Sequence, residues 1–122
     1  MSRPTPLPPI PEALLEEARR ERAIVGYVKP GATREPILCD GAVVGFYSPH
    51  QTKWGLSFAP VYVTPAYRRR GLCLTAYTSR RDVTMWAFAA DWNVASREML
   101  LKAGFTVWRR GNRGLFYRRV AT

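Results

Sequence analysis

Hydrophobic and polar positions follow a helical period in a few stretches of this chain and form short strand-like runs in the others. The clearest helical pattern is at residues 12–22, where Leu14, Leu15 and Ala18 share one stripe and acidic residues precede the arginines, as the helix dipole favours. This pattern predicts an amphipathic helix that covers a sheet. Five of the ten prolines fall within the first eleven residues. We therefore expect an extended lead-in over residues 1–10 and a single domain over residues 11–122.

Short apolar runs separated by turn residues predict the strands. Asp40-Gly41 stands between the apolar runs 36–39 and 42–47, which is the strongest short signal for a β-hairpin. Further strands are expected at 23–29, 54–63, 83–90, 105–109 and 115–120, with residues 48–53 as a connection. Pro60 cannot donate to a ladder, so it predicts a bulge or an edge that opens the sheet.

Two more helices are predicted in the second half of the chain. One begins at Gly71 and extends to about Arg80, and the other covers residues 94–102, with Asn93 as its N-cap and Gly104 as the left-handed residue that ends it. The nearly continuous apolar run 83–90 between them is typical of a buried, parallel strand. Strands alternating with helices in this way predict a mixed α/β (α+β) fold.

Composition narrows the class of protein. The chain has 122 residues, 47% of them hydrophobic, and fits one domain with a real core. No apolar run approaches the ~18 to 20 residues that span a bilayer, and the N-terminus lacks a signal-like segment, so we expect a cytoplasmic protein without a membrane partner. Cys39 and Cys73 are spaced neither as a metal knuckle nor as a redox pair, and His50 is the single histidine. We expect reduced thiols and no metal site.

The net charge of +10 is placed unevenly. Residues 1–63 carry five Arg and two Lys against six acids, whereas residues 64–122 carry eleven Arg and one Lys against three acids, a net charge of +9. Arginine forks onto phosphate and stacks on bases, so the second half predicts a polyanionic partner, either a phosphorylated cofactor or nucleic acid. The alternative is that the charge only keeps the protein soluble.

The residues 61–73 combine an apolar strand, a proline turn, three arginines and a glycine at a helix start. The first N–H groups of a helix lack intrahelical partners and attract anions, phosphate above all. Gly71 allows a ligand to approach the backbone closely. The stretch therefore indicates an anion site, with a solvated basic turn as the alternative.

Two segments, in this order, carry a resemblance to a known family. Residues 61–73 read Val-Tyr-Val-Thr-Pro-Ala-Tyr-Arg-Arg-Arg-Gly-Leu-Cys, and residues 93–105 read Asn-Val-Ala-Ser-Arg-Glu-Met-Leu-Leu-Lys-Ala-Gly-Phe. The first is similar to the strand, turn and Arg/Gln-x-x-Gly-x-Gly/Ala loop of the GNAT N-acetyltransferase superfamily, and the second to its Asn-x-x-Ala/Ser helix that ends in Lys-x-Gly-Phe. The chain thus resembles a small, strongly basic GNAT protein over about residues 36–120.

The resemblance implies a fold, a cofactor and an activity. The fold would be a mixed, splayed central sheet of six to seven strands with about three helices, and acetyl-CoA would lie in the gap as co-substrate. Strand backbone would pair with the pantetheine arm, the basic loop would hold the diphosphate, and the second motif would line the pantetheine side. The implied cofactor-binding residues are Val61, Val63, Arg68, Arg69, Arg70, Gly71, Leu72, Cys73, Asn93 and Ser96.

The sequence departs from the family pattern at three points. Cys73 stands where the family prefers Gly or Ala, and the interval from Gly71 to Asn93 is short by about two helical turns. Leu100 occupies the position of the tyrosine that in many members protonates the departing thiolate. Positioning of two substrates can still supply a large part of the rate, so an enzyme without this tyrosine is feasible.

The catalytic residues are predicted from the polar side chains near the expected thioester. We predict a water relay with Tyr62 or Tyr67, and we keep His50 as the alternative. Other side chains that could act as the base are Ser57, Glu35, Asp40, Asp82 and Asp91.

Acetyl-CoA accounts for Arg68–Arg70 but leaves many arginines without a ligand. They include Arg80, Arg81, Arg109, Arg110, Arg113, Arg118 and Arg119, interleaved at the C-terminus with Trp108, Phe116 and Tyr117. This pattern predicts a phosphate-tracking surface with stacking partners.

The overall prediction is an N-acetyltransferase that uses a primary amine on or near nucleic acid, as a monomer or homodimer. An acidic protein that presents a lysine is the alternative acceptor. Two other classes stay open: a GNAT-fold module that binds CoA or nucleic acid without turnover, and a small basic nucleic-acid-binding domain.

Overall fold

The computed structural model describes residues 7–21 and 33–122, so the strand expected at residues 23–29 and the first part of the lead-in lie outside the described residues. Within them the chain forms three α-helices, one short 3-10 helix and eight strands. The elements are α1 (Glu12–Arg19), β1 (Glu35–Cys39), β2 (Ala42–Tyr47), β3 (His50–Thr52), β4 (Gly55–Ser57), β5 (Val61–Val63), η1 (Pro65–Tyr67), α2 (Leu72–Thr78), β6 (Met85–Ala90), α3 (Val94–Lys102), β7 (Thr106–Arg110) and β8 (Gly114–Arg119).

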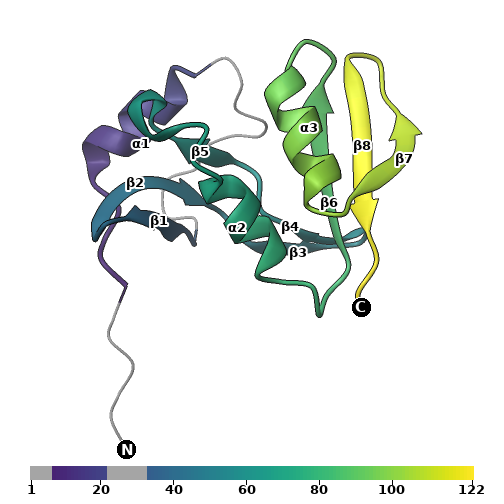
Figure 1. Ribbon diagram of the computed structural model, residues 1–122, viewed down its shortest axis with the longest axis horizontal. Helices are drawn as coiled ribbons and strands as arrows, with labels where there is room; N and C mark the ends of the chain where they lie inside the picture. The colour runs from purple at the N-terminus through teal and green to yellow at the C-terminus, as the bar shows by residue number, and fades with distance from the viewer. Residues whose placement is uncertain (1–6, 22–32) are drawn as a thin grey trace, which may run out of the picture.

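The strands form two sheets, which Figure 1 shows meeting at an angle. One sheet has the order β1-β2-β5 and the other β3-β4-β6-β8-β7. The predicted hairpins 36–47 and 105–120 are confirmed as the antiparallel pairs β1–β2 and β7–β8. The predicted α/β (α+β) class and the splayed sheet are also confirmed, with eight described strands instead of the expected six to seven.

Two details of the strand prediction were wrong. Residues 48–53 are not only a connection, because His50–Thr52 pairs with Gly55–Ser57 as a β-hairpin. Residues 54–63 are not one bulged strand but two strands in different sheets, separated by the Ala59–Pro60 bond, which is cis. These two departures raise the strand count above the expected range.

The strand β6 shows a third difference. It was expected to be parallel, but it pairs in parallel only at Leu56–Met85 and is antiparallel to β8 along its whole length. The apolar run reflects burial by α2 and α3 on one face and by aromatic neighbours on the other, so its composition did not report strand direction.

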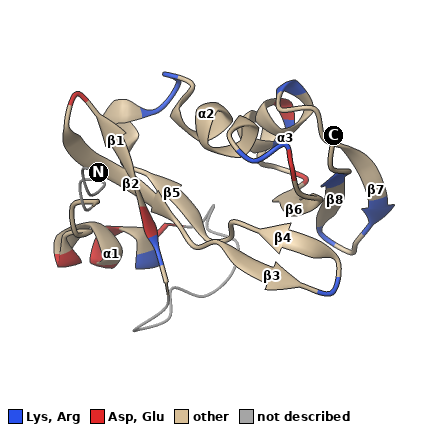
Figure 2. Cartoon of the chain, turned by 90° about the horizontal axis from the view of Figure 1, so that it is seen from below, with Lys and Arg blue, Asp and Glu red and all other residues tan. Residues whose placement is uncertain are grey.

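The helices cover the sheets unequally. Leu14, Leu15 and Ala18 of α1 pack on Phe46 and Tyr62 of the three-stranded sheet. The helix α2 lies on the other side, where it contacts both sheets, and α3 lies beside it on the five-stranded sheet (Figure 2). Among the described elements, no helix lies against the second face of the five-stranded sheet. No described helix is both long enough and apolar enough to cross a membrane.

The predicted ends of α3 are confirmed. Asn93 caps the helix by accepting a hydrogen bond from the Ser96 amide at 3.2 Å. Gly104 follows the helix with φ of 93°, and the amide of Phe105 donates back to the carbonyl of Leu100 at 3.0 Å. Glycine reaches this left-handed conformation without a steric penalty, which is why the helix ends there.

Candidate functional site: the gap between β5 and β6

The two sheets separate at a wedge between β5 and β6. The strand β4 is held to β6 at Leu56–Met85, and the Leu56 amide donates to the Thr84 carbonyl at 2.9 Å. Beyond this point Pro60 has no N–H to donate, and the chain turns to join β2 instead. The edge of β5 that faces β6 therefore has no ladder partner among the described strands.

Main-chain groups of β5 point into this wedge. The Thr64 amide donates to the Val44 carbonyl at 2.8 Å, in register with the β2–β5 ladder. Bonded and non-bonded pairs alternate in an antiparallel ladder, so Tyr62 bonds to Phe46 and the main-chain groups of Val61 and Val63 face away from β2. The Val63 carbonyl accepts from Arg68 Nε at 2.8 Å. Val61 thus offers a strand edge to a ligand in the gap.

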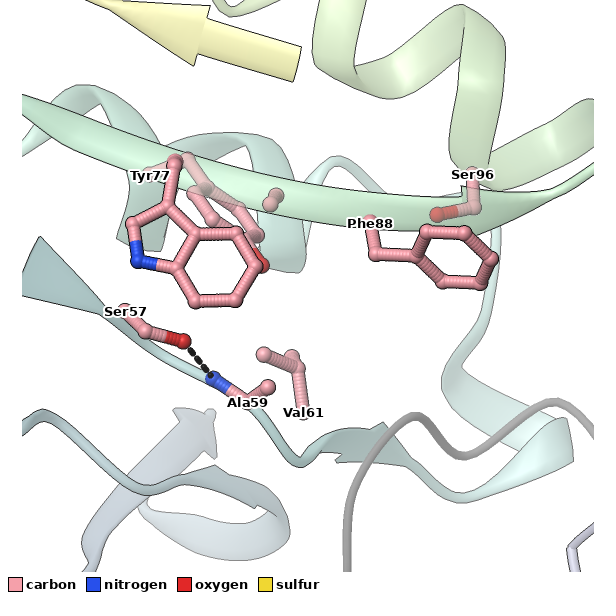
Figure 3. Close-up of a pocket in the computed structure, with 8 residues that line it drawn as sticks. Ser57, Ala59, Val61, Tyr77, Phe88 and Ser96 are labelled. Carbon is pink, nitrogen blue, oxygen red and sulfur yellow. Dashed lines mark hydrogen bonds between the residues drawn. The ribbon is translucent and has the colours of Figure 1, made fainter. Parts of the chain in front are cut away.

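A narrow pocket occupies the gap. Its walls come from five elements and one connection, and the lining residues are Ser57, Ala59, Val61, Tyr77, Trp86, Ala87, Phe88 and Ser96. Figure 3 shows Ser57, Ala59 and Val61 on one wall and Phe88 and Ser96 on the opposite one. The walls combine apolar and aromatic side chains with exposed polar atoms, as in a site for an extended, partly polar chain.

The Tyr77 side chain reaches the pocket from α2. Its ring is buried between Phe58, at a centroid distance of 5.2 Å, and Phe105, at 5.6 Å. Its hydroxyl has no hydrogen-bond partner among the described residues. Burial raises the pKa of Tyr77 above its usual range, so the hydroxyl stays protonated at neutral pH and can donate a hydrogen bond.

Ser57 provides the second hydroxyl on the pocket wall. It is 2% exposed, and its Oγ accepts a hydrogen bond from the Ala59 amide at 3.2 Å. This contact holds the chain at the point where β4 leaves the five-stranded sheet. The Ser57 hydroxyl hydrogen remains available to an acceptor in the pocket.

Solved structures share the fold of this chain. No model of a protein family matches the sequence, and a search of curated proteins found no match either. A GNAT family acetyltransferase from Elizabethkingia anophelis, solved with acetyl-CoA bound, superimposes with a TM-score of 0.60 at 10% identity, over 93% of this chain and 92% of that one. The chain has the GNAT fold.

Two smaller matches agree with this fold. The PaiA N-acetyltransferase from Thermoplasma acidophilum, in complex with coenzyme A, has 16% identity and a TM-score of 0.56 over 68% of this chain and 57% of that one. An acetyltransferase from Agrobacterium tumefaciens has 17% identity and a TM-score of 0.52 over 65% and 54%. The chain thus spans just over half the length of these two proteins.

The basic loop of this GNAT fold lies at the start of α2. Arg69 and Gly71 both have left-handed backbone, with φ of 64° and 75°, and a Cβ at Gly71 would meet no atom within 4 Å. The side chains of Arg69 and Arg70 are exposed, and Arg70 lies 4.9 Å from the ring of Tyr67. Arg68 also bonds to Glu21 at 2.9 Å, so part of its charge is neutralised within the protein.

The two residues that follow Gly71, at the start of α2, pack into the core. Leu72 and Cys73 pack against Ile37, Val44 and Val63. Burial raises the pKa of the Cys73 thiol, which therefore serves as a small apolar side chain rather than as a nucleophile.

The α3 residues divide between the pocket and the core. Ser96 lines the pocket, whereas Asn93 uses its side-chain oxygen as the cap of α3. Leu100, at the position of the usual family tyrosine, is 1% exposed and belongs to the same core cluster as Tyr77. A tyrosine on α2 therefore reaches the pocket beside the leucine on α3.

The predicted catalytic side chains do not line the pocket. Tyr62 turns toward α1, where its hydroxyl bonds to Glu17, and burial together with this bond raises the pKa of Tyr62 to about 12. Tyr67 lies in η1 under Arg70. His50 is exposed on β3, with Nδ1 2.8 Å from the Ser48 carbonyl.

Sequence reasoning found part of the pocket and missed the rest. Val61, Ser96 and the candidate base Ser57 line it, and their roles toward a cofactor stay predictions. Tyr77, Trp86 and Phe88 were missed. The alternation of large and small residues along β6 was a signal for the last two, because it places Trp86 and Phe88 on one face.

Proposed function

We propose that the protein is an acetyl-CoA-dependent N-acetyltransferase that transfers the acetyl group to a primary amine by direct attack in a ternary complex. The observation that carries this proposal is the pocket in the wedge between β5 and β6, bordered by the unpaired edge of Val61. The domain that does this would be residues 11–122. Neighbours of the same fold with CoA or acetyl-CoA bound support the choice of cofactor.

The residues around the pocket fit the chemical parts of acetyl-CoA. The strand edge at Val61 and Val63 would pair with the amides of the pantetheine arm, with Ser96 and Asn93 on the opposite side. Arg69, Arg70 and the amides of Gly71, Leu72 and Cys73 would hold the diphosphate, while Arg68 would fix the Val63 carbonyl and add charge. When bound, acetyl-CoA supplies an activated acetyl group as a thioester.

Tyr77 is our candidate for the proton donor. In acetyl transfer the amine nitrogen bonds to the acetyl carbon, the carbon–sulfur bond breaks, and the sulfur takes up a proton while the nitrogen loses one. The protonated Tyr77 hydroxyl can donate to the sulfur, and the proton released by the amine restores it through water. The relay through Tyr62 or Tyr67, and His50 as a base, stay predictions that single substitutions can test.

The acceptor amine is proposed to lie on or close to nucleic acid, with a lysine of an acidic protein as the alternative. The proposal is supported by the cations that remain after the basic loop is assigned to the cofactor, including Arg109, Arg113 and Arg118. An enzyme of this size would act as a monomer or homodimer. Salt-titrated binding separates the two acceptors, because neutralising phosphates produces a steep salt dependence.

Calorimetry with acetyl-CoA, followed by an acetylation assay on amines, tests the proposal. Ser96→Phe fills the pocket, whereas Ala95→Phe adds a ring at an exposed position of the same helix. We expect Ser96→Phe to abolish measurable binding and Ala95→Phe to keep the wild-type affinity. Equal affinities in the two variants would rule out the pocket as the cofactor site.

A second function has specific support. Leu100 replaces the usual tyrosine, so the protein can be a GNAT-fold module that binds CoA or nucleic acid without turnover. Acetyl-CoA binding without product from any amine would favour this module. Absence of acetyl-CoA binding would remove the enzyme and the CoA-binding module, and absence of nucleic-acid binding as well would remove both functions.

A further inference from the structure

The second face of the five-stranded sheet carries large aromatic residues and arginine. In the β6–β8 register, Trp86 lies opposite Arg118 and Phe88 opposite Phe116, so these four side chains share one face. Their neighbours Met85, Ala87 and Tyr117 point to the other face, under α2 and α3. Tyr117 is 1% exposed there, so it cannot serve as the predicted stacking partner.

A ring of Trp54 crosses this face. The centroid of Trp54 lies 5.2 Å from that of Trp86, 5.4 Å from Trp108 and 6.2 Å from Phe116, with steep interplanar angles of 83°, 75° and 76°. These residues come from β6, β7 and β8 and from the β3–β4 turn. All four rings are half-buried, because they pack on one another while part of each stays exposed to solvent.

Three cations lie over the same rings. Lys53 is 5.3 Å from Trp54, Arg118 is 5.5 Å from Trp108, and Arg109 is 5.8 Å from Phe116. None of the three has a carboxylate partner among the described residues. The Nε of Arg118 is buried and has no hydrogen-bond partner among the described residues. The guanidinium groups are therefore available to an anion that approaches the rings.

No acidic residue of the C-terminal half belongs to this face. Asp82 and Asp91 lie in turns beside Arg80 and Arg110, and Glu98 is on α3, which covers the opposite face. The surface therefore combines rings, positive charge and an absence of acidic residues from this half of the described chain. We name it the aromatic face: Lys53, Trp54, Trp86, Trp108, Arg109, Phe116 and Arg118.

This combination matches single-stranded nucleic acid. Bases stack on aromatic side chains through their flat surfaces, and arginines pair with the phosphates that connect them. A duplex hides its bases in stacked pairs, so the rings could not reach them. An acidic protein would satisfy the charges but would leave the open sides of the rings without matching groups.

We propose that the aromatic face binds single-stranded nucleic acid by base stacking and phosphate contacts. Trp86 and Phe88 also border the pocket, so a strand bound there would bring its amines beside the gap. The idea that such an amine is the acetyl acceptor rests on the proposed acetyl transfer. Binding itself does not depend on acetyl-CoA.

Fluorescence anisotropy with labelled oligonucleotides of about 12 nucleotides, within the site size of such surfaces, tests the proposal without acetyl-CoA. We expect the wild-type protein to bind single-stranded DNA or RNA with micromolar or better affinity at low salt, and the duplex of the same sequence several-fold more weakly. Binding should also quench the tryptophan fluorescence. Equal affinity for the duplex, equal affinity for polyglutamate, or no binding at all would overturn the proposal.

Matched variants locate the site. Arg109→Gln with Arg118→Gln removes two charges from the aromatic face, and Arg80→Gln with Arg81→Gln removes two charges between α2 and β6. We expect the first pair to weaken binding at least tenfold, with a salt slope reduced by roughly one to two, because each lost phosphate contact releases about one counterion fewer. The second pair should change affinity less than about threefold, and equal losses in both pairs would refute the assignment.

A substitution of one aromatic ring tests the proposal even if the protein with both arginine substitutions does not fold. Trp108→Leu preserves an apolar side chain but removes a stacking surface, so affinity should fall about fivefold or more while the salt slope stays the same. Thermal unfolding by circular dichroism checks that each variant is folded. Unchanged affinity in a folded Trp108→Leu protein would exclude base stacking.

Discussion

Arg118 and Arg119 are neighbours in sequence but lie in opposite environments. Arg119 is 6% exposed, and its guanidinium donates to the carbonyls of Ala103, Tyr77 and Arg80 at 2.8, 2.7 and 3.0 Å. Arg118 lies over the ring of Trp108 and has no carboxylate partner among the described residues. One arginine ties helices and loops to the sheet, while the other faces outward.

The charge of an arginine in this chain therefore does not by itself indicate its role. Alternation along β8 sends successive side chains to opposite faces, so equal charges serve opposite purposes. Burial without an acid lowers the pKa of Arg119 from its usual value, yet three carbonyl dipoles stabilise its charge. Arg119 therefore does not belong to the predicted phosphate-tracking surface. Arg110 is also paired within the protein, because it forms a bidentate salt bridge with Asp91 through hydrogen bonds of 2.7 and 2.6 Å.

The largest expected effect is the difference in the free energy of unfolding between substitutions of these two arginines. Arg119→Met would leave three carbonyls without their donor in a buried position and should lower the free energy of unfolding by about 3 kcal/mol or more. Arg118→Met loses a half-buried cation–π contact and should cost about 1 kcal/mol. Urea unfolding measures both. Similar losses in the two variants would contradict the assignment of the faces.

The next largest effect is expected at Tyr77, which lines the pocket between β5 and β6. Tyr77→Phe removes the hydroxyl but keeps the ring between Phe58 and Phe105, so stability and acetyl-CoA affinity should be nearly unchanged. If Tyr77 donates the proton to sulfur, kcat for acetyl transfer should fall about 100-fold. Steady-state kinetics gives the split between kcat and KM.

Tyr67→Phe is the matched control for this substitution, because Tyr67 lies outside the pocket. It should leave kcat within about twofold of the wild type, well below the effect of a lost proton donor. A large loss in Tyr67→Phe and none in Tyr77→Phe would instead support the relay predicted from the sequence.

The aromatic face should contribute moderately to stability. Trp54→Ala removes contacts with three rings and should lower the free energy of unfolding by about 2 kcal/mol, near the lower end of what three aromatic pairs at about 0.5 to 1.5 kcal/mol each contribute, because the rings are half-buried. Leu101→Ala, at a side chain that is 55% exposed, is the control and should change stability by less than about 0.5 kcal/mol. An equally small effect at Trp54 would show that the rings do not form a stabilising cluster.

The smallest effect is a pH-dependent contact on the three-stranded sheet. Hydrogen bonds from the Tyr62 hydroxyl, and then from Thr64, hold the pKa of Glu17 below its usual value of 4.5. A lowered folded-state pKa gives stability that is present above 4.5 and is lost as the pH falls through the folded-state pKa. Glu17→Gln should thus cost only a few tenths of a kcal/mol at pH 7, because Glu17 is exposed and solvent screens the contact, and almost nothing in acid. Thermal unfolding at both pH values checks this, and a constant difference would contradict it.

Local signals were sufficient for much of the fold. Asp40-Gly41 between apolar runs specified the β1–β2 hairpin, and Asn93 with Gly104 specified both ends of α3. These features depend on hydrogen bonds and backbone angles among residues close in sequence, so their chemistry can be read locally. The same holds for Pro60, whose missing N–H predicted where the sheet opens.

Tertiary contacts decided the site. Local sequence signals were enough for most of the elements outside residues 48–63, for the position of the opening at Pro60 and for the excess of positive charge. Only the tertiary structure brought Tyr77 to the gap beside Leu100 and sent Arg118 and Arg119 to opposite faces. The physical reason is that burial and partners come from segments distant in sequence: the carbonyls that bind Arg119 lie 16 to 42 residues away.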